Sequence, residues 1–190
     1  MITDGAQLLD INGQRKYLHA REAKRLLAAA ARADRETRLF CHLLYYTGCR
    51  VSEGLALTPR LLDTELARVV FRTLKRRKLV HRAVPLPAPF LRELAELAKH
   101  RALDERLFPW SRSTGWRRIK ALMDAAGIDG PQATPKGLRH HFGVHAIGCK
   151  MAESSVGRWL GHAEPKSTYI YTAALGDEER ALVRRMWKER

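Results

Sequence analysis

Apolar residues recur at helical spacing through most of the chain, and the spacing changes to a strand-like pattern in one central stretch. In the first helical stretch, Ala23, Leu26, Leu27 and Ala30 fall on one face of a helix predicted over 20–33. The same reasoning predicts helices over 36–47, 51–57, 88–100, 114–126, 135–149, 153–160, 166–173 and 177–188. The chain is therefore expected to be largely helical.

Capping residues support several of these boundaries. Gly48 follows the helix predicted over 36–47 and is a good stop signal, because glycine adopts the left-handed conformation that ends many helices. Thr134 is a favourable N-cap and is followed by Pro135, a residue preferred at the first helical position. Gly161 ends the helix predicted over 153–160 in the same way as Gly48.

The central stretch predicts a β-hairpin. Residues 67–73 are rich in β-branched and aromatic side chains, and residues 80–86 are able to pair with them. The tip between them, 74–79, reads Leu-Lys-Arg-Arg-Lys-Leu. Like charges crowded at a tip repel one another, so a phosphate-bearing partner would stabilise them. The predicted fold class is mainly α with a small antiparallel β-sheet (α+β).

The charge balance indicates a polyanionic partner. Among 190 residues, 35 Lys and Arg outnumber 20 Asp and Glu, which gives a formal net charge of +15. Such an excess is typical of nucleic-acid-binding proteins, although a solvated basic surface would give the same composition. The length suits one domain with small extensions.

Several function classes are not supported by the sequence. No run of 18 apolar residues and no signal peptide is found, so no membrane span is expected and a cytoplasmic location is predicted. Cys41, Cys49 and Cys149 lack metal-ligand spacing and are interpreted as reduced thiols. No phosphate-binding Walker loop and no paired acidic cluster occurs, so no cofactor or metal is predicted.

Five polar residues stand out by their order and their local context. They are Arg50 in T-G-C-R-V-S-E, Lys75 on the hairpin, Arg139 in K-G-L-R, His162 in L-G-H, and Tyr171 in S-T-Y-I-Y-T. His162 follows Arg139 by 23 residues, and Tyr171 follows His162 by nine. Each segment alone is a weak signal, but the ordered set resembles the catalytic domain of tyrosine recombinases, the phage integrase and Xer family, over roughly residues 18–175.

The chemistry of phosphodiester cleavage explains why these residue types are needed. Negative charge builds on the non-bridging oxygens during attack, and Arg50 and Arg139 offer planar donors to hold them. His162 would donate a further hydrogen bond. The resemblance implies that Tyr171 attacks and stays joined to the 3′ phosphate, while Lys75 protonates the departing 5′ oxygen.

Two assignments have rivals nearby. Tyr169 lies two positions before Tyr171, and residues at this spacing face different directions on a helix, so only one should face the phosphate. The family pattern favours Tyr171. Lys75 directly follows the predicted strand, as the family lysine does. The neighbouring cations are interpreted as phosphate contacts or solvated charges; they are Arg76, Arg77 and Lys78.

The second motif departs from the family pattern. It usually reads H-x-x-R, whereas here Lys136 replaces the histidine, as in some members and in an arrangement similar to type IB topoisomerases. Lys136 is still able to donate to phosphate and is included among the catalytic candidates. His140 is a candidate DNA contact, with a polar helix surface or a satisfied inner histidine as the alternatives. Glu53 is expected to orient neighbouring basic groups.

The resemblance also divides the chain. Residues 1–17 are predicted to be an N-terminal extension, 18–175 the catalytic domain, and 176–190 a C-terminal helix that either docks on a neighbouring subunit or folds back. Most family members carry a further N-terminal helical domain that closes around DNA. The residues before the catalytic pattern are too few for it, so a minimal or shortened recombinase is expected.

These observations predict a site-specific recombinase that cuts and rejoins duplex DNA. The resemblance implies a homo-tetramer on DNA that exchanges strands through a four-way junction. One alternative is a type IB topoisomerase-like enzyme, which relaxes DNA as a monomer. The other is a non-catalytic DNA-binding protein of the same fold, against which the intact set of five polar residues argues.

Overall fold

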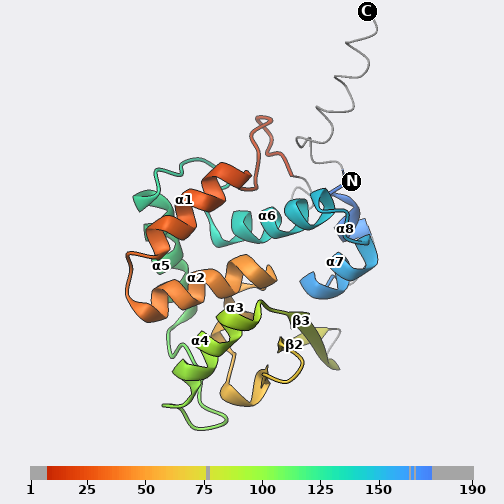
Figure 1. Ribbon diagram of the computed structural model, residues 1–190. Coiled ribbons are helices and arrows are strands. Elements are labelled where there is room, and N and C mark those ends of the chain that lie inside the picture. The colour runs from red at the N-terminus through yellow and green to blue at the C-terminus, as the bar shows by residue number, and fades with distance from the viewer. Residues whose placement is uncertain (1–7, 76–77, 163, 165, 173–190) are drawn as a thin grey trace, which may run out of the picture.

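The computed structural model describes residues 8–75, 78–162, 164 and 166–172, with the backbone alone for 73–75, 78–79 and 166 (Figure 1). The elements in chain order are α1 (Ala20–Ala30), α2 (Arg35–Thr47), α3 (Val51–Leu55), a 3-10 turn (Pro59–Leu61), β1 (Leu62–Asp63), β2 (Arg68–Lys75), β3 (Lys78–Pro85), α4 (Ala88–Ala98), α5 (Arg112–Ala125), α6 (Pro135–Gly148), α7 (Glu153–Leu160) and α8 (Lys166–Tyr169).

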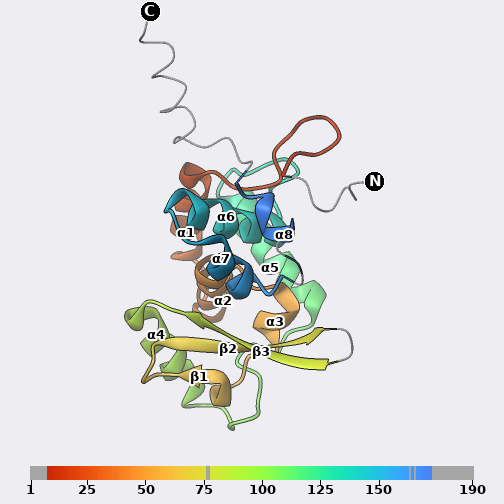
Figure 2. The ribbon, with the colours of Figure 1, turned by 90° about the vertical axis from the view of Figure 1, so that its right-hand side faces the viewer.

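The predicted fold class is confirmed, and each predicted helix up to residue 173 has a counterpart whose ends differ by a few residues. The helix predicted over 177–188 lies outside the described residues. The sheet and α4 lie at one end of the molecule, α1, α6 and α8 lie at the other, and α2 and α3 lie between them (Figure 2).

The sheet is antiparallel with the strand order β1-β2-β3. Pairing of β2 with β3 continues to Lys75 opposite Lys78, so the six-residue tip expected from the sequence is too long. The short strand β1 was not expected, because two residues are too few to show a period. Val69 and Val84 face each other and are buried, which attaches the sheet to the core.

Local sequence accounts for the helix ends that position the site. Gly48 has φ 59° and Gly161 has φ 67°, so both helices end in the left-handed conformation that the glycines predict. A side chain at Gly48 would meet Phe142 and Leu160 within 2.8 Å, so α2 ends in close contact with α6 and α7. The Thr134 hydroxyl accepts a hydrogen bond from the Gly137 amide at 3.0 Å and starts α6.

Most helices and the inner face of the sheet share one hydrophobic core, in which Phe40 packs edge-on against Phe108 and Trp110. A second, smaller cluster lies between α6 and the segment that follows α7. It consists of Leu8, Ala146, Val156, Leu160 and Tyr171. Tyr171 is therefore buried in this second cluster and not in the main hydrophobic core.

The described part of the predicted N-terminal extension packs on the domain. Residues 8–16 form a turn, in which the Asp10 carboxylate accepts hydrogen bonds from the amides of Asn12 and Gln14. Arg15 forms an ion pair with Glu22 at the start of α1, with 2.7 Å between Nη2 and Oε1. Since Leu8 belongs to the cluster around Tyr171, this segment contributes to the surroundings of the candidate nucleophile.

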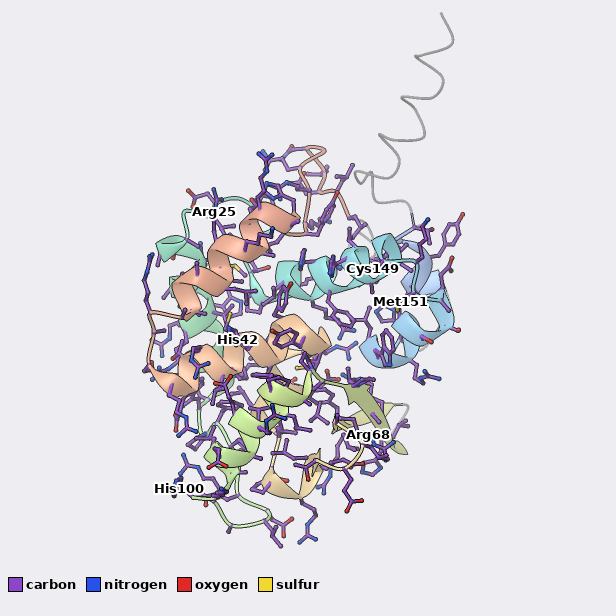
Figure 3. All side chains as sticks on the ribbon, viewed as in Figure 1. Arg25, His42, Arg68, His100, Cys149 and Met151 are labelled. Carbon is purple, nitrogen blue, oxygen red and sulfur yellow. The ribbon has the colours of Figure 1, made fainter. Side chains whose placement is uncertain are left out.

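All three cysteines are free thiols. Cys41 and Cys49 are buried, and burial raises the pKa of each thiol to about 12, so both fit a packing role. Cys149 is exposed at the end of α6 (Figure 3). Among the described residues, no group of His, Cys, Asp and Glu side chains is arranged to hold a metal ion. No helix in the described ranges has the length and apolar character needed to cross a membrane.

Candidate active site

Arg139 joins the ends of two helices that are far apart in the sequence. Its Nη1 donates to the carbonyl oxygen of Gly48 and its Nη2 to that of Leu160, each at 2.7 Å. These bonds bring the first motif, at the end of α2, next to the third motif, at the end of α7. A guanidinium has five N–H donors, so donors remain for an anion.

Arg139 carries its charge in a largely dehydrated position. Loss of hydration, followed by the positive charge of Arg50, lowers the pKa of the Arg139 guanidinium to about 10. The group still carries its charge at neutral pH, because 10 is well above 7. An arginine held in this way is a charge that an incoming anion would stabilise.

The Glu53 cluster, which consists of Arg50, Glu53 and Arg82, fixes a second arginine. Glu53 accepts two hydrogen bonds from Arg82, with Nη2 to Oε2 at 2.6 Å and Nη1 to Oε1 at 3.0 Å. It also accepts from Arg50, through the backbone amide at 2.7 Å and through Nη1 at 3.0 Å. Glu53 thus orients basic neighbours, as the sequence predicts.

The charges in this cluster differ in exposure. Burial alone would raise the pKa of the Glu53 carboxyl, but the hydrogen bonds and charge of Arg82, with those of Arg50, lower it to about 2. The Arg82 side chain is 5% exposed and also donates through Nε to the Trp159 carbonyl. Arg50 is 47% exposed, so a phosphate could reach it.

Arg82 was missed by the sequence analysis, although a signal was present. In a strand, residues two apart share a face. Arg82 therefore faces the same side of β3 as Val84, which is buried. A positive charge on the inward face of a strand requires a buried partner, and Glu53 is the partner found.

His162 directly follows the glycine that ends α7. Its Nδ1 lies 2.8 Å from the Thr168 hydroxyl oxygen, and its ring stacks on that of Tyr171 with centroids 6.0 Å apart. Burial, followed by the charges of Arg139 and Arg50, lowers the pKa of His162 to about 4, so the ring is neutral at pH 7. If Thr168 donates to Nδ1, then Nε2 carries the proton and is available to donate to a phosphate.

Tyr171 and Tyr169 are in different surroundings. Tyr171 is 2% exposed, lies against His162 and has its hydroxyl oxygen 3.3 Å from Nδ1 of His140. Burial raises the pKa of its phenol, and the charges of Arg139 and Arg50 oppose this rise. Tyr169 is 64% exposed. Of the two, it is Tyr171 that lies near the arginines.

Gly143 allows Tyr171 to lie against α6. A Cβ at this position would come within 2.7 Å of three atoms of the tyrosine ring. No sequence pattern marks Gly143, because a glycine within a helix is not distinctive unless the residue that packs on it is known. The structure supplies that residue.

The remaining predicted residues are placed as follows. Lys75 ends β2 and is paired in register with Lys78, but the side chains of both are outside the described part, as are Arg76 and Arg77 entirely. Lys136 is exposed in the first turn of α6. His140, expected as a DNA contact, is 6% exposed, and its side chain faces Tyr171 rather than the outer surface.

A basic surface depression on α5 was also not anticipated. It has a volume of about 600 Å³ and is lined by Arg112, Ser113, Trp116 and Arg117. Trp116 is 42% exposed. Two arginines beside an exposed indole offer both charge and a flat apolar face, a combination that suits nucleic acid.

The chain is similar in sequence to known proteins over most of its length. The profile of the phage integrase family matches residues 16–178. Tyrosine recombinase XerA of Pyrococcus furiosus is 32% identical over 180 residues, and XerD of Caulobacter vibrioides is 33% identical over 181. These alignments cover 90% and 85% of this chain but 61% and 58% of the relatives, so the chain spans about three fifths of their length.

Solved structures share the fold. The catalytic domain of bacteriophage HP1 integrase matches with a TM-score of 0.66 and 24% identity, covering 87% of this chain and 92% of that one. XerH recombinase bound to its difH substrate matches with a TM-score of 0.73 and 20% identity, covering 91% of this chain and 58% of XerH. The chain therefore shares its fold with the catalytic domain of HP1 integrase and with part of XerH.

Proposed function

The chain belongs to the phage integrase family, and from this premise we propose that it cuts and rejoins duplex DNA through a covalent bond between Tyr171 and a 3′ phosphate. The observation that carries the proposal is the position of Arg139. It bonds to the carbonyls of Gly48 and Leu160, next to the stacked rings of His162 and Tyr171.

The arginines supply the phosphate site. Arg50 is half-exposed and is held by the buried carboxylate of Glu53, so it is oriented before DNA arrives. Arg139 is more deeply placed and is oriented by two carbonyls. Preorganised cations of this kind stabilise the charge that grows on the non-bridging oxygens during attack. His162 adds a neutral donor through Nε2.

Tyr171 needs these cations to react. A free phenol has a pKa of about 10, and burial raises that of Tyr171 further, while Arg139 and Arg50 counteract the rise. The hydroxyl has to reach the phosphorus for attack, and the side chain is 2% exposed. We therefore propose that DNA binding brings the phosphate to the hydroxyl while the Tyr171 ring keeps the position that the structure shows.

The leaving oxygen needs a proton, and Lys75 at the end of β2 is proposed to donate it. Lys136, exposed one turn before Arg139, is proposed as a further donor to the phosphate. Tyr171 loses its phenol proton to solvent and forms one P–O bond as the bond to the 5′ oxygen breaks, so the phosphotyrosine ester conserves the energy of the cut bond. Rejoining reverses the step and needs no external energy source.

Duplex DNA is the proposed substrate because the chain carries a net charge of +15 and a basic surface on α5 beside Trp116. XerH, which has the same fold, was solved bound to its difH substrate, and this supports the proposal that the chain binds DNA. We propose in addition that it assembles there as a homo-tetramer. Residues 18–175 would form the catalytic unit and 176–190 a helix exchanged between subunits. An enzyme acting on duplex DNA works where the DNA is, so we propose the cytoplasm.

Covalent capture tests this function without knowledge of the target site. Nicked duplexes with a randomised central sequence are incubated with the wild type, Tyr171→Phe and Tyr169→Phe, and protein-linked DNA is recovered under denaturing conditions. The wild type and Tyr169→Phe are expected to form a 3′-linked adduct and Tyr171→Phe none. An adduct that persists in Tyr171→Phe and disappears in Tyr169→Phe would refute the assignment.

A second assay separates recombination from relaxation. Captured sequences are cloned in pairs on a supercoiled plasmid and incubated with the chain. Exchange between the two copies supports a recombinase. Relaxation without any recombinant product supports the type IB topoisomerase-like alternative, in which strand cutting is retained and strand exchange is not.

A further inference from the structure

His140 contacts the candidate nucleophile from inside the domain. It follows Arg139 on α6, is 6% exposed, and has its Nδ1 3.3 Å from the hydroxyl oxygen of Tyr171. The two rings lie 5.9 Å apart at an angle of 56°. Its other ring nitrogen, Nε2, is buried and has no hydrogen-bond partner among the described residues. The contact with Tyr171 is therefore the hydrogen bond that the described residues offer this ring.

The ring of Tyr171 is confined on two sides. Gly143 lies against its face, because a Cβ added there would come within 2.7 Å of three ring atoms. His162 stacks on the ring, with the two centroids 6.0 Å apart. Both neighbours restrict where the ring lies, but neither forms a hydrogen bond with the Tyr171 hydroxyl among the described contacts. Among the described residues, His140 is the side chain with a hydrogen bond to that oxygen.

The ring of His140 is neutral at pH 7. Burial, followed by the charges of Lys136, Arg139 and Lys16, lowers its pKa to about 4. A base this weak is poorly matched to a phenol, whose pKa is about 10 even when free. His140 is therefore suited to hold the hydroxyl rather than to remove its proton.

We propose that His140 is a positioning residue that fixes the direction of the Tyr171 hydroxyl through Nδ1, so that the oxygen faces the phosphate bound by the arginines. This inference rests on the proposed function, in which Tyr171 is the nucleophile. Holding the phenol limits the orientations that the oxygen has to search before attack, which is an entropic contribution to the rate.

His141 provides a matched control on the same helix. It is also buried, and its Nδ1 lies 2.7 Å from the carbonyl oxygen of Leu18, while its ring stacks on Tyr45 and His145. It thus resembles His140 in burial and in hydrogen bonding through Nδ1. It differs in bonding to the N-terminal segment instead of to Tyr171.

Isosteric substitutions separate the two nitrogens of His140. An asparagine amide reaches about the position of Nδ1, and a glutamine amide reaches that of Nε2, while leucine provides neither. The experiment measures the single-turnover rate of adduct formation at saturating nicked DNA for the wild type, His140→Asn, His140→Gln, His140→Leu and His141→Leu. DNA affinity and the thermal midpoint are measured for each variant.

His140→Leu and His140→Gln are expected to react about tenfold more slowly than the wild type, with DNA affinity unchanged, a loss typical of one hydrogen bond. His140→Asn should remain within about threefold of the wild type, since it keeps the bond. His141→Leu should lower the thermal midpoint without slowing the reaction. Rescue by asparagine but not by glutamine is a pattern that a purely structural role would not produce.

Two results would overturn the inference, and they can be told apart. If the wild type forms an adduct and all His140 variants match its rate, or if they slow only in proportion to their lost stability, His140 does not position Tyr171. If the wild type forms no adduct on any duplex, the proposed function itself is wrong, and the role of His140 is rejected with it.

Discussion

Two buried glutamates, Glu22 in α1 and Glu53 in α3, bind arginines in nearly the same way. In the Glu22 cluster, which consists of Arg15, Glu22 and Gln132, the carboxylate accepts bonds from Arg15, from Gln132 at 3.1 Å and from the His19 amide at 3.0 Å. In the Glu53 cluster, Glu53 accepts from Arg82 and Arg50. Both glutamates are less than 10% exposed.

The electrostatics of the two glutamates are also alike. Burial would raise the pKa of each carboxyl, but the hydrogen bonds it accepts and the charges of its arginines together outweigh burial, so that both carboxyls have a pKa of about 2. The difference lies in what the carboxylate holds. Glu22 holds the segment 8–18 against α1, whereas Glu53 shares its charge between a buried arginine, Arg82, and a half-exposed one, Arg50.

This difference distinguishes an ion pair that we interpret as structural from one that lies at the proposed phosphate site. Arg82 already compensates the Glu53 charge, so the second arginine is oriented by the cluster and is still accessible to an anion. In the Glu22 cluster Arg15 compensates the carboxylate. The second basic group there is His19, whose Nδ1 lies 3.9 Å from Oε2 and which carries a charge only when protonated, whereas Arg50 is always charged. A strongly lowered pKa is therefore insufficient to identify a site.

The largest effect is expected for Glu53→Gln. Removing this charge leaves Arg82 buried without its ionic partner and releases Arg50, so the free energy of unfolding should fall by about 3–5 kcal/mol. Adduct formation should be lost at the same time. Chemical denaturation and covalent capture measure the two effects, with Glu22→Gln as the matched control. Stability equal to that of the wild type would show that the cluster is not held by its charge.

The next effect separates the two clusters by activity. Arg50→Ala should slow adduct formation by about a hundredfold, the loss typical of one donor to a developing oxyanion. Its stability should change little, because Glu53 keeps Arg82. Arg15→Ala should lower the stability of the fold and leave the rate of adduct formation unchanged. Single-turnover rates and denaturation midpoints are measured for both variants. Equal loss of activity in the two would contradict the assignment of different roles to the two clusters.

The sequence predicted more of the site than of the contacts that assemble it. Arg50, Arg139, His162 and Tyr171 were located because each lies in a short motif, and the structure brings all four together. The contacts that hold these four side chains in place are harder to predict from the sequence. Arg139 bonds to backbone carbonyls, and carbonyls carry no residue-specific signal.

The fold was predictable to a similar extent. Helix ends at Gly48 and Gly161 followed from glycine chemistry, and the sheet followed from β-branched residues. The contact between His140 and Tyr171 depends on tertiary packing over 31 positions, so local pattern placed His140 on a helix but not on its inner face. The role of Arg15 was missed for the same reason, since its partner lies in another element.

A smaller effect is expected from Glu22→Gln. The variant keeps a hydrogen-bonding side chain but loses the ion pair with Arg15, so the free energy of unfolding should fall by about 1–3 kcal/mol. Adduct formation should remain at the wild-type rate, because Leu8 and Tyr17 contact the cluster around Tyr171 through apolar packing. Denaturation with urea measures the first expectation and covalent capture the second. A slowed reaction at full stability would assign the N-terminal segment a catalytic role.

The smallest expected effect is on acid stability, where the clusters should behave alike. Both carboxyl pKa values are about 2 in the folded chain, below the ordinary value of 4.5, so protonation favours unfolding. Their contribution is present above about pH 4.5 and is lost as the pH falls toward 2. Each Glu→Gln variant should therefore bind about one proton fewer on unfolding in this range, which lowers the slope of unfolding free energy against pH by up to about 1.4 kcal/mol per pH unit.

Urea midpoints measured from pH 5 to pH 2.5 give that slope, and an unchanged slope in one variant would mean that its carboxyl keeps an ordinary pKa. Equal slopes in variants of unequal activity would establish that the exposure of the second arginine, and not the strength of the ion pair, distinguishes the Glu53 cluster.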